Sequence, residues 1–334
     1  MPNGVCIQKP GGDSPNLELP EGEPPPFPFL CTRKMMADEA TLYGTDDWHY
    51  KMFVDAMMPR GQGSRRILTR QSCERNGALN EPIWRDSHRT KIGFLDAAYR
   101  GVGGDRCVFG ELQFGTEAES EPGTTFLSNL IAQNAEVVGT RKIIALIDLL
   151  IVPISAERDA ESPEEQICKF VKGECERRGI PPDHFYYDSG MRTSLVQTFS
   201  RIWSPAVESV DCGGKASEQM VSVEIQQRCC DYYSKFITEL WYSMRLCVEC
   251  KQFRGLTRDA MWEFCAREFK TVGNNKIEVE TKEDMKKKSG RSPDLADSIA
   301  VGVWGARQRG FVISRIKPPK DDGEYEDDAW RRKL

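Results

Sequence analysis

The sequence predicts an α/β fold in which helices flank a mixed sheet of antiparallel hairpin strands and parallel strands. Three observations support this class. Short apolar runs on either side of turn residues, between Lys91 and Phe114, indicate a β-hairpin. A longer apolar run at residues 142–154 and a short aromatic run at residues 184–190 indicate two more strands. A predicted helix between these two runs favours a parallel crossover.

The composition is that of a globular chain without a membrane span or an export signal. With 39% hydrophobic content, the 334 residues suffice for one large domain or two ordinary ones. The longest apolar run falls short of the ~20 residues of a membrane helix, and the N-terminus does not resemble a signal peptide. A net charge of -5 makes any nucleic-acid-binding surface a local feature. The 12 cysteines follow no repeating spacing, which indicates reduced thiols in a cytoplasm.

Composition also divides the chain into four parts. Residues 1–30 are rich in Pro, Gly and acidic side chains and predict a disordered arm. Residues 31–88 have weak periodicity and predict a linker or the end of another domain. The main domain is expected at residues 89–316, followed by a charged tail at residues 317–334.

The first strand of the hairpin ends at Asp96. Aspartate is a poor strand residue, and a buried charge is costly unless it meets a cation or a hydrogen-bond partner. Two interpretations follow: Asp96 caps the turn at residues 101–105, or it is a functional carboxylate held at the end of a buried strand.

A second carboxylate ends the aromatic strand. Before it, Ser162 as cap, Pro163 in the first turn and Gly179 as stop predict a helix. Asp188 then ends the strand, and residues 193–203 predict the next helix. Because parallel strands that end in Asp bring their carboxylates to one sheet edge, Asp188 is expected to converge with the Asp of the hairpin.

The remaining elements are predicted from periodicity and turn residues. The segment 125–137, before the long apolar run, predicts a helix. After the second carboxylate we expect a strand at residues 206–210, one long amphipathic helix over residues 224–253, a helix capped by Thr257 that runs through Phe269, and a last strand from Lys276.

A third acidic segment follows, KEDMKKKSGRSPDLADSIAVGVWGAR. Ser292 is the predicted helix cap and Pro293 the first helical residue, which places Asp294 and Asp297 three apart on one face. The helix dipole alone explains Asp294. Asp297 lies a turn further in among apolar residues and is the better functional candidate; the alternative is an exposed Asp paired with a Lys.

Three segments in this order resemble the nuclease domain of the large terminase subunit of tailed bacteriophages, a ribonuclease H-like family: IGFLDAAYRGVGGDRCV, YYDSGMRTSLV and KEDMKKKSGRSPDLADS. The resemblance covers roughly residues 89–309. More faintly, TLYGTDDWHYKMFVDAMMPRGQ resembles the end of the ATPase domain that precedes this nuclease. Neither glycine turn, GVGGDR or GGKAS, has the spacing of a phosphate loop, so a nuclease portion without a packaging motor is expected.

The resemblance implies a metal-dependent endonuclease that cuts concatemeric double-stranded DNA by two-metal phosphodiester hydrolysis. Two Mg²⁺ or Mn²⁺ ions suit an all-carboxylate site. On this reading Asp96 bridges the ions, Asp188 holds one and Asp297 the other. Asp294 is the expected fourth acid, with Asp105 as an outside candidate.

The basic residues around the third acid are expected to hold the DNA backbone, although a solvated basic face is an equal alternative. The resemblance also implies a small terminase subunit and a portal as partners, no membrane, and the host-cell cytoplasm for a viral or prophage protein. Two other functions stay open: a junction-resolvase type of nuclease, and a catalytically idle DNA-binding or assembly module. The predicted DNA contacts are Lys282, Lys286, Lys287, Lys288 and Arg291.

Overall fold

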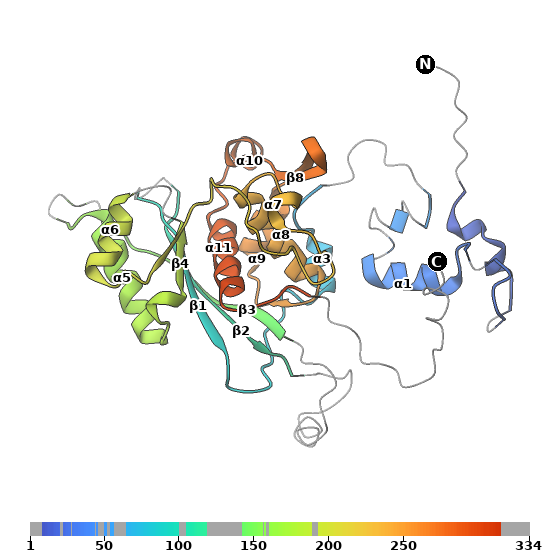
Figure 1. Cartoon of the computed structure of the whole chain (residues 1–334), viewed down its shortest axis with the longest axis horizontal. Coiled ribbons are helices and arrows are strands. Elements are labelled where there is room, and N and C mark those ends of the chain that lie inside the picture. Colours follow the sequence, from blue (N-terminus) through green and yellow to red (C-terminus); the bar gives the residue numbers. More distant parts are fainter. Residues whose placement is uncertain are drawn as a thin grey trace, which may run out of the picture. The chain divides into compact units, whose positions relative to one another are not determined.

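The chain forms two compact units, Met1–Arg65 and Arg66–Leu334, in the computed structural model (Figure 1). The predicted helix at residues 125–137, most of the predicted turn at 101–105 and the predicted tail at 317–334 lie outside the described residues. The structure describes residues 9–20, 23–27, 29–43, 45, 50–51, 54–56, 65–99, 105–118, 142–155, 157, 160–188 and 193–314.

Side-chain hydrogen bonds link separate parts of the first unit. Ser14 Oγ donates to the Cys31 carbonyl at 2.6 Å, and Asn16 Nδ2 donates to the Phe27 carbonyl at 2.8 Å. These bonds tie residues of the predicted arm to later parts of the unit. Its elements are η1 (Gly11–Asp13), η2 (Pro15–Leu17) and α1 (Arg33–Tyr43).

The second unit is built on a six-stranded mixed sheet with the order β5-β4-β1-β2-β3-β6. Strand β2 pairs antiparallel with β1 and with β3. The pairs β1–β4, β4–β5 and β3–β6 are parallel. The predicted hairpin and the mixed sheet of antiparallel and parallel strands are thus confirmed. The strands are β1 (Thr90–Asp96), β2 (Val108–Thr116), β3 (Lys142–Ile151), β4 (Phe185–Asp188), β5 (Glu208–Val210) and β6 (Phe253–Arg254).

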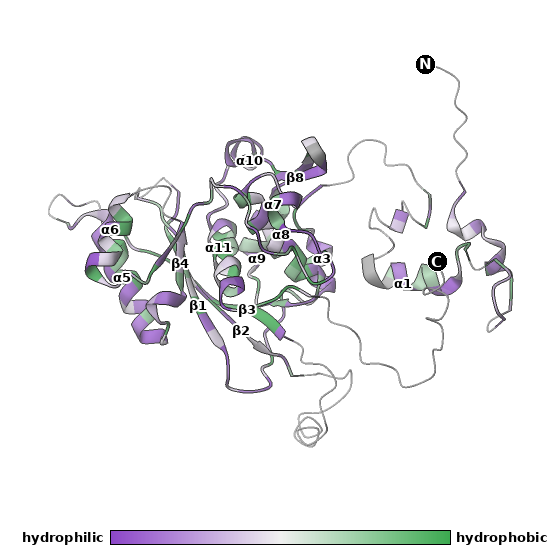
Figure 2. Ribbon diagram, viewed as in Figure 1, coloured by the Kyte–Doolittle hydropathy of each residue, from purple (hydrophilic) through white to green (hydrophobic). Residues whose placement is uncertain are grey.

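Helices cover both faces of this sheet (Figure 1). Successive side chains of a strand point to opposite faces, so Phe94 joins the apolar cluster under α8, α9 and α11, whereas Leu95 joins the cluster under α5 and α6. Each covering helix carries hydrophobic and hydrophilic residues, as an amphipathic layer requires (Figure 2). The helices are α5 (Pro163–Arg178), α6 (Thr193–Ile202), α8 (Phe236–Glu249), α9 (Arg258–Ala266) and α11 (Asp294–Gln308).

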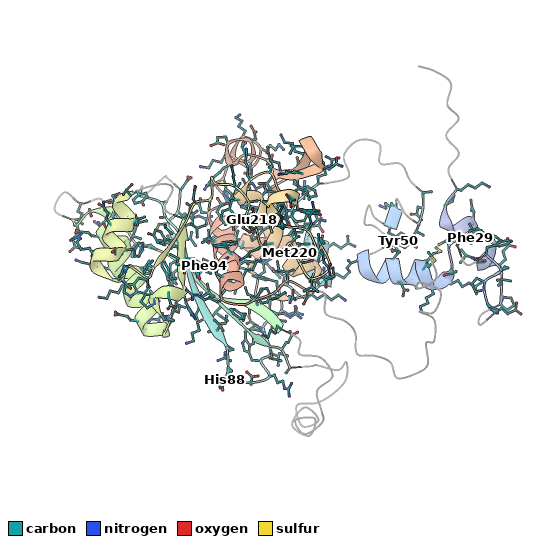
Figure 3. The ribbon with its side chains drawn as sticks, in the orientation of Figure 1. Phe29, Tyr50, His88, Phe94, Glu218 and Met220 are labelled. Atoms are coloured by element: carbon teal, nitrogen blue, oxygen red, sulfur yellow. The ribbon has the colours of Figure 1, made fainter. Side chains whose placement is uncertain are left out.

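Two glycines let α11 lie close to the sheet. A Cβ at Gly302 would overlap the ring of Phe94, and a Cβ at Gly305 would overlap the ring of Tyr186. Phe94 projects from β1 toward this helix (Figure 3). The close approach places the first turn of α11 over the sheet edge where β1 and β4 end.

Residues 66–88, expected in the linker, pack with the second unit. Ile67, Leu68 and Cys73 are buried in its larger apolar cluster. A reciprocal cap between Thr69 and Ser72 starts the short helix α3 (Arg70–Arg75).

The single long helix predicted over residues 224–253 is wrong. Two helices take its place, α7 (Cys229–Tyr232) and α8, separated by extended backbone. Tyr233 is buried and bridges to Ile277, and the neighbouring Ser234 N–H donates to the Ile277 carbonyl. Tertiary pairing with a strand from elsewhere in the chain has overridden the local helical pattern.

That strand is β8 (Lys276–Val279), as predicted from Lys276, and it pairs antiparallel with β7 (Phe269–Val272). The Thr257 cap is confirmed, since its Oγ1 accepts the Ala260 N–H at 3.3 Å. The helix ends before Phe269, however, because Arg267 turns extended and its carbonyl accepts the Ile67 N–H.

The predicted cap of α5 is confirmed, and the predicted cap of α11 is wrong. Ser162 caps α5, with its Oγ accepting the Glu165 N–H at 3.3 Å, and Gly179 ends it in a left-handed conformation. Ser292 makes no capping bond: α11 begins at Asp294 with Pro293 as its N-cap residue. In the described part of the chain, no helix is both long and apolar enough to cross a bilayer.

Candidate active site

Two of the predicted acids meet at one edge of the sheet. The parallel register of β1 and β4 pairs Asp96 directly with Asp188. Neighbouring strands lie about 4.8 Å apart, so both carboxylates leave the sheet side by side. The predicted convergence of these two residues is confirmed.

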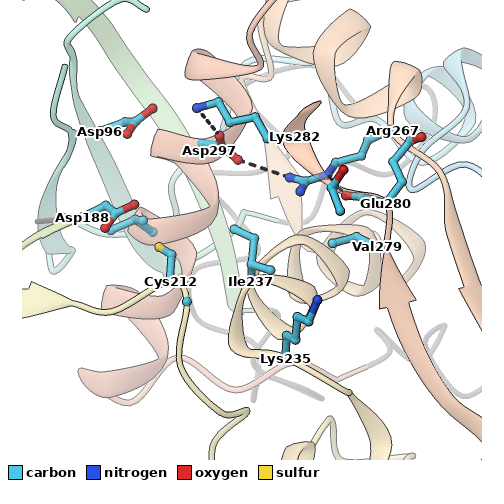
Figure 4. Close-up of a pocket in the computed structure, with 13 residues that line it drawn as sticks. Asp96, Asp188, Cys212, Lys235, Ile237, Arg267, Val279, Glu280, Lys282 and Asp297 are labelled. Carbon is cyan, nitrogen blue, oxygen red and sulfur yellow. Dashed lines mark hydrogen bonds and ion pairs between the residues drawn. The ribbon is translucent and has the colours of Figure 1, made fainter. Parts of the chain in front are cut away.

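Asp297 joins them from α11. All three carboxylates line one pocket with a cavity volume of about 310 Å³ (Figure 4). The chain segments that carry these residues are far apart in sequence, and the close packing of α11 on β1 and β4 brings them together.

Asp297 is held by three donors. Its Oδ1 accepts the Trp241 indole N–H at 2.8 Å and lies 3.4 Å from Arg267 Nη1. Its Oδ2 lies 3.0 Å from Lys282 Nζ. The Arg267 guanidinium lies 4.3 Å from the centre of the Trp241 ring, which fixes both donors. Asp297 is therefore a half-buried, oriented carboxylate rather than an exposed helix Asp.

Lys282, predicted to contact the DNA backbone, instead points into this acidic cluster. Besides Asp297, its Nζ lies 3.7 Å from Asp294 Oδ1. Burial disfavours the charged ammonium, but the carboxylates of Asp297 and Asp96 outweigh burial and raise the pKa of Lys282. The cluster thus already contains one cation at neutral pH.

The electrostatics of Asp96 show how crowded the acids are. Burial and the nearby Asp297 and Asp188 carboxylates raise the pKa of Asp96 well above its usual value, against the opposing effect of Lys282. Cys212, which the sequence did not single out, also lines the pocket just beyond β5. Burial and the same acids raise the pKa of its thiol, which therefore stays protonated.

Asp294 lies beside the pocket rather than on its wall. Its buried Oδ2 accepts the backbone N–H of Arg106 at 2.8 Å and lies 3.4 Å from Arg106 Nε. The residue thus ties the start of α11 to the start of β2. Asp105, the outside candidate, pairs with Lys286 at 2.8 Å.

Glu263 of α9 supplies the cap that α11 lacks. Its Oε2 accepts the Ala296 N–H at 2.9 Å, and its Oε1 accepts Arg106 Nη2 at 2.5 Å. Burial raises the pKa of Glu263 to about 6. Because Glu263 and Ala296 are 33 residues apart, no local pattern could predict this cap.

The other predicted DNA contacts lie on or just after α10 (Lys282–Ser289), and Arg291 is exposed. The lysines pair with acidic neighbours: Lys286 with Asp105, Lys287 with Asp284 at 3.2 Å, and Lys288 with Glu268 at 3.0 Å and Glu280 at 2.8 Å. Exposed pairs of this kind contribute little to stability.

Comparisons with known proteins give structural matches only. No family model and no curated protein sequence matches the chain. The nuclease domain of the large terminase subunit gp2 of bacterial virus Sf6 is 14% identical with a TM-score of 0.44, over 71% of this chain and 98% of that one. A mutant of that domain with manganese and beta-thujaplicinol gives a TM-score of 0.42 at the same identity and coverage. The large terminase nuclease from thermophilic phage G20c is 11% identical with a TM-score of 0.37, over 71% and 97% of the two chains.

Proposed function

We propose that this chain is the metal-dependent DNA endonuclease of a viral genome-packaging terminase, which cuts concatemeric double-stranded DNA by hydrolysing phosphodiester bonds. The observation that carries the proposal is the convergence of Asp96, Asp188 and Asp297 from two strands and a helix in one pocket. Structural acids seldom gather in this way, because like charges in a buried site repel each other.

The chemistry of the donors fits hard divalent cations. Carboxylate oxygens suit Mg²⁺ and Mn²⁺, and Asp96, Asp188 and Asp297 would hold the ions. Bound ions supply charge stabilisation for the attacking and leaving oxygens. Among the described residues, no three His, Cys, Asp or Glu side chains are grouped closely enough to hold an ion as they stand. An entering ion would therefore compete with Lys282 for Asp297.

Residues of the chain prepare the site. Trp241 and Arg267 fix the orientation of the Asp297 carboxylate before any substrate arrives. The ammonium of Lys282 brings a positive charge to the place where negative charge would develop on a phosphodiester during hydrolysis. Donors that are already in position need no reorganisation during the reaction.

The exposed basic residues would bind DNA without reading its sequence. Lys286, Lys287, Lys288 and Arg291 can exchange their acidic neighbours, or water, for backbone phosphates, and such binding weakens steeply with salt. A small terminase subunit and a portal are the proposed partners, in the cytoplasm of the infected cell.

Cleavage of linear duplex DNA with Mn²⁺ or Mg²⁺, and its loss in EDTA, tests the proposal. Asp96→Asn and Asp297→Asn should each abolish cleavage, whereas Asp259→Asn, an exposed acid in the first turn of α9, should leave it intact. Cleavage that persists in both pocket variants defeats the proposal. Preferential cutting of four-way junctions would instead favour a resolvase.

The ion pair between Lys282 and Asp297 favours one alternative, a catalytically idle DNA-binding module in which the ammonium permanently replaces a metal ion. Such a protein would shift plasmid DNA on a gel while leaving it intact with every divalent cation tried.

A further inference from the structure

The pocket carries opposite charges in different regions. Asp96, Asp188 and Asp297 lie on one side, and Lys235 lies on another, with Ile237 and Val279 lining the wall as well (Figure 4). Glu280 lines the wall beside Arg267. The proposed chemistry uses the acidic side. Lys235 and the apolar part of the wall have no role in it.

Lys235 is available to an anion. It occupies the N-cap position of α8, where it makes no side-chain capping bond, and 52% of its side chain is exposed. Its ion pair with Glu278 is long, at 3.8 Å, and an exposed pair of this kind is weak. The positive end of the α8 dipole adds to the charge of the Lys235 ammonium.

Arg267 supplies a fixed positive charge in the same wall. Only 4% of its side chain is exposed, and its Nε donates to the Glu280 carbonyl at 3.0 Å. Stacking on Trp241 holds the guanidinium in place. An anion in this pocket would therefore meet the exposed ammonium of Lys235 and the buried guanidinium of Arg267, which also faces Asp297.

We infer that Lys235, supported by Arg267, binds a second phosphate of the DNA strand being cut, next to the phosphate that is hydrolysed at the acidic side. A nucleotide unit places an apolar sugar face between two phosphates, and Ile237 and Val279 offer an apolar wall. At about 310 Å³ the cavity accommodates a segment of one strand rather than a duplex. The inference rests on the proposed nuclease function and assigns a contact on its substrate.

Lys270 provides a matched control. Lys235 and Lys270 both pair with Glu278, at 3.8 and 3.9 Å, and their side chains are 52% and 61% exposed. Of these two lysines, Lys235 lines the pocket and Lys270 does not. Replacing either lysine with Ala removes the same charge near the same carboxylate, so a difference between the two variants reports on the pocket.

The experiment measures kcat/KM for linear duplex cleavage with Mn²⁺ over a series of NaCl concentrations, for wild type, Lys235→Ala, Lys235→Arg and Lys270→Ala. The slope of log(kcat/KM) against log[NaCl] is negative, and each lost phosphate contact reduces its magnitude by about 0.9. Lys235→Ala should show this decrease, and Lys235→Arg and Lys270→Ala should keep the wild-type slope. Thermal melting of each variant checks that it is folded.

Equal slopes for Lys235→Ala and wild type, or an equal decrease in both Ala variants, would overturn the inference and leave the nuclease function standing. Wild-type protein that cuts no DNA would remove the function itself, together with this contact. The two failures are thus distinguishable within one set of measurements.

Discussion

Asp96 and Asp188 are direct partners in the parallel register of β1 and β4, so the two strands deliver their last residues to the same point. The pairing is fixed by backbone hydrogen bonds and by the buried side chains on both faces of the strands. A one-residue slip would turn one carboxylate to the opposite face. The register of β1 and β4 therefore sets the geometry of the proposed site.

Asp96→Asn and Asp297→Asn should differ in stability although both should abolish cleavage. The folded protein raises the pKa of Asp96, so ionisation of this group destabilises the fold as the pH rises from about 4 toward its folded-state value. Asp96→Asn should therefore be more stable than wild type at pH ~7 and equal to it below pH ~4.

The Asp297→Asn change has the opposite expected effect at neutral pH, because it removes the charged partner of the buried Arg267 and one of the charged partners of Lys282. We expect a loss of about 1–3 kcal/mol in the free energy of unfolding. Urea unfolding of both variants at several pH values provides the measurement. Equal stability of the two variants at neutral pH would contradict this assignment of partners.

Glu263→Gln tests the cap on α11. The folded pKa of Glu263 is about 6, against 4.5 for an ordinary glutamate, so wild-type stability falls as the pH rises through this interval. The decrease should amount to about 2 kcal/mol and be absent in the variant. Urea unfolding at pH ~4.5, ~5.5 and ~7 gives the difference between the two proteins. A difference that is independent of pH would argue against a buried ionised cap.

Arg178→Met should be strongly destabilising. Arg178 Nη1 lies 3.0 Å from Glu111 and Nη2 lies 2.7 Å from Asp148, and the side chain of Glu111 is only 4% exposed. Removal of the arginine leaves a buried carboxylate unpaired, at about 3–5 kcal/mol. The neighbouring Arg177, 63% exposed, is the control, and Arg177→Met should change stability by less than ~0.5 kcal/mol. Similar melting temperatures for the two variants would refute this distinction.

Gly302→Ala should destabilise the packing of α11 on the sheet. The new Cβ would lie 2.5 Å from Phe94 Cδ1 and 2.7 Å from Leu112 Cδ1, so the core must shift, at about 1–3 kcal/mol. Gly173→Ala in α5 meets no atom within 4 Å and should instead stabilise by about 0.5–1 kcal/mol. Chemical denaturation distinguishes the two, and a neutral Gly302→Ala would show that the contact is not tight.

Local signals predicted the parts of the fold that local bonds determine. The cap at Ser162 and the stop at Gly179 each depend on residues within a few positions of one another. The hairpin pairs two strands that follow each other directly in the chain, with Asp96 opposite Val108. The long helix over residues 224–253 was wrong because the extended pairing of Tyr233 with Ile277 depends on a distant strand. Periodicity contains no information about such a partner.

By itself the sequence determined which residues are acids, that Asp96 and Asp188 end strands, and that Asp297 lies inside an apolar helix turn. Only the tertiary structure decided that Lys282 enters the acidic cluster, that Glu263 caps α11 from another helix, and that Lys235 shares the pocket. The physical reason is the distance along the chain over which each interaction acts. Strand ends and helix faces follow from neighbouring residues, whereas the partner of a buried charge is chosen by the packing of elements far apart in the chain.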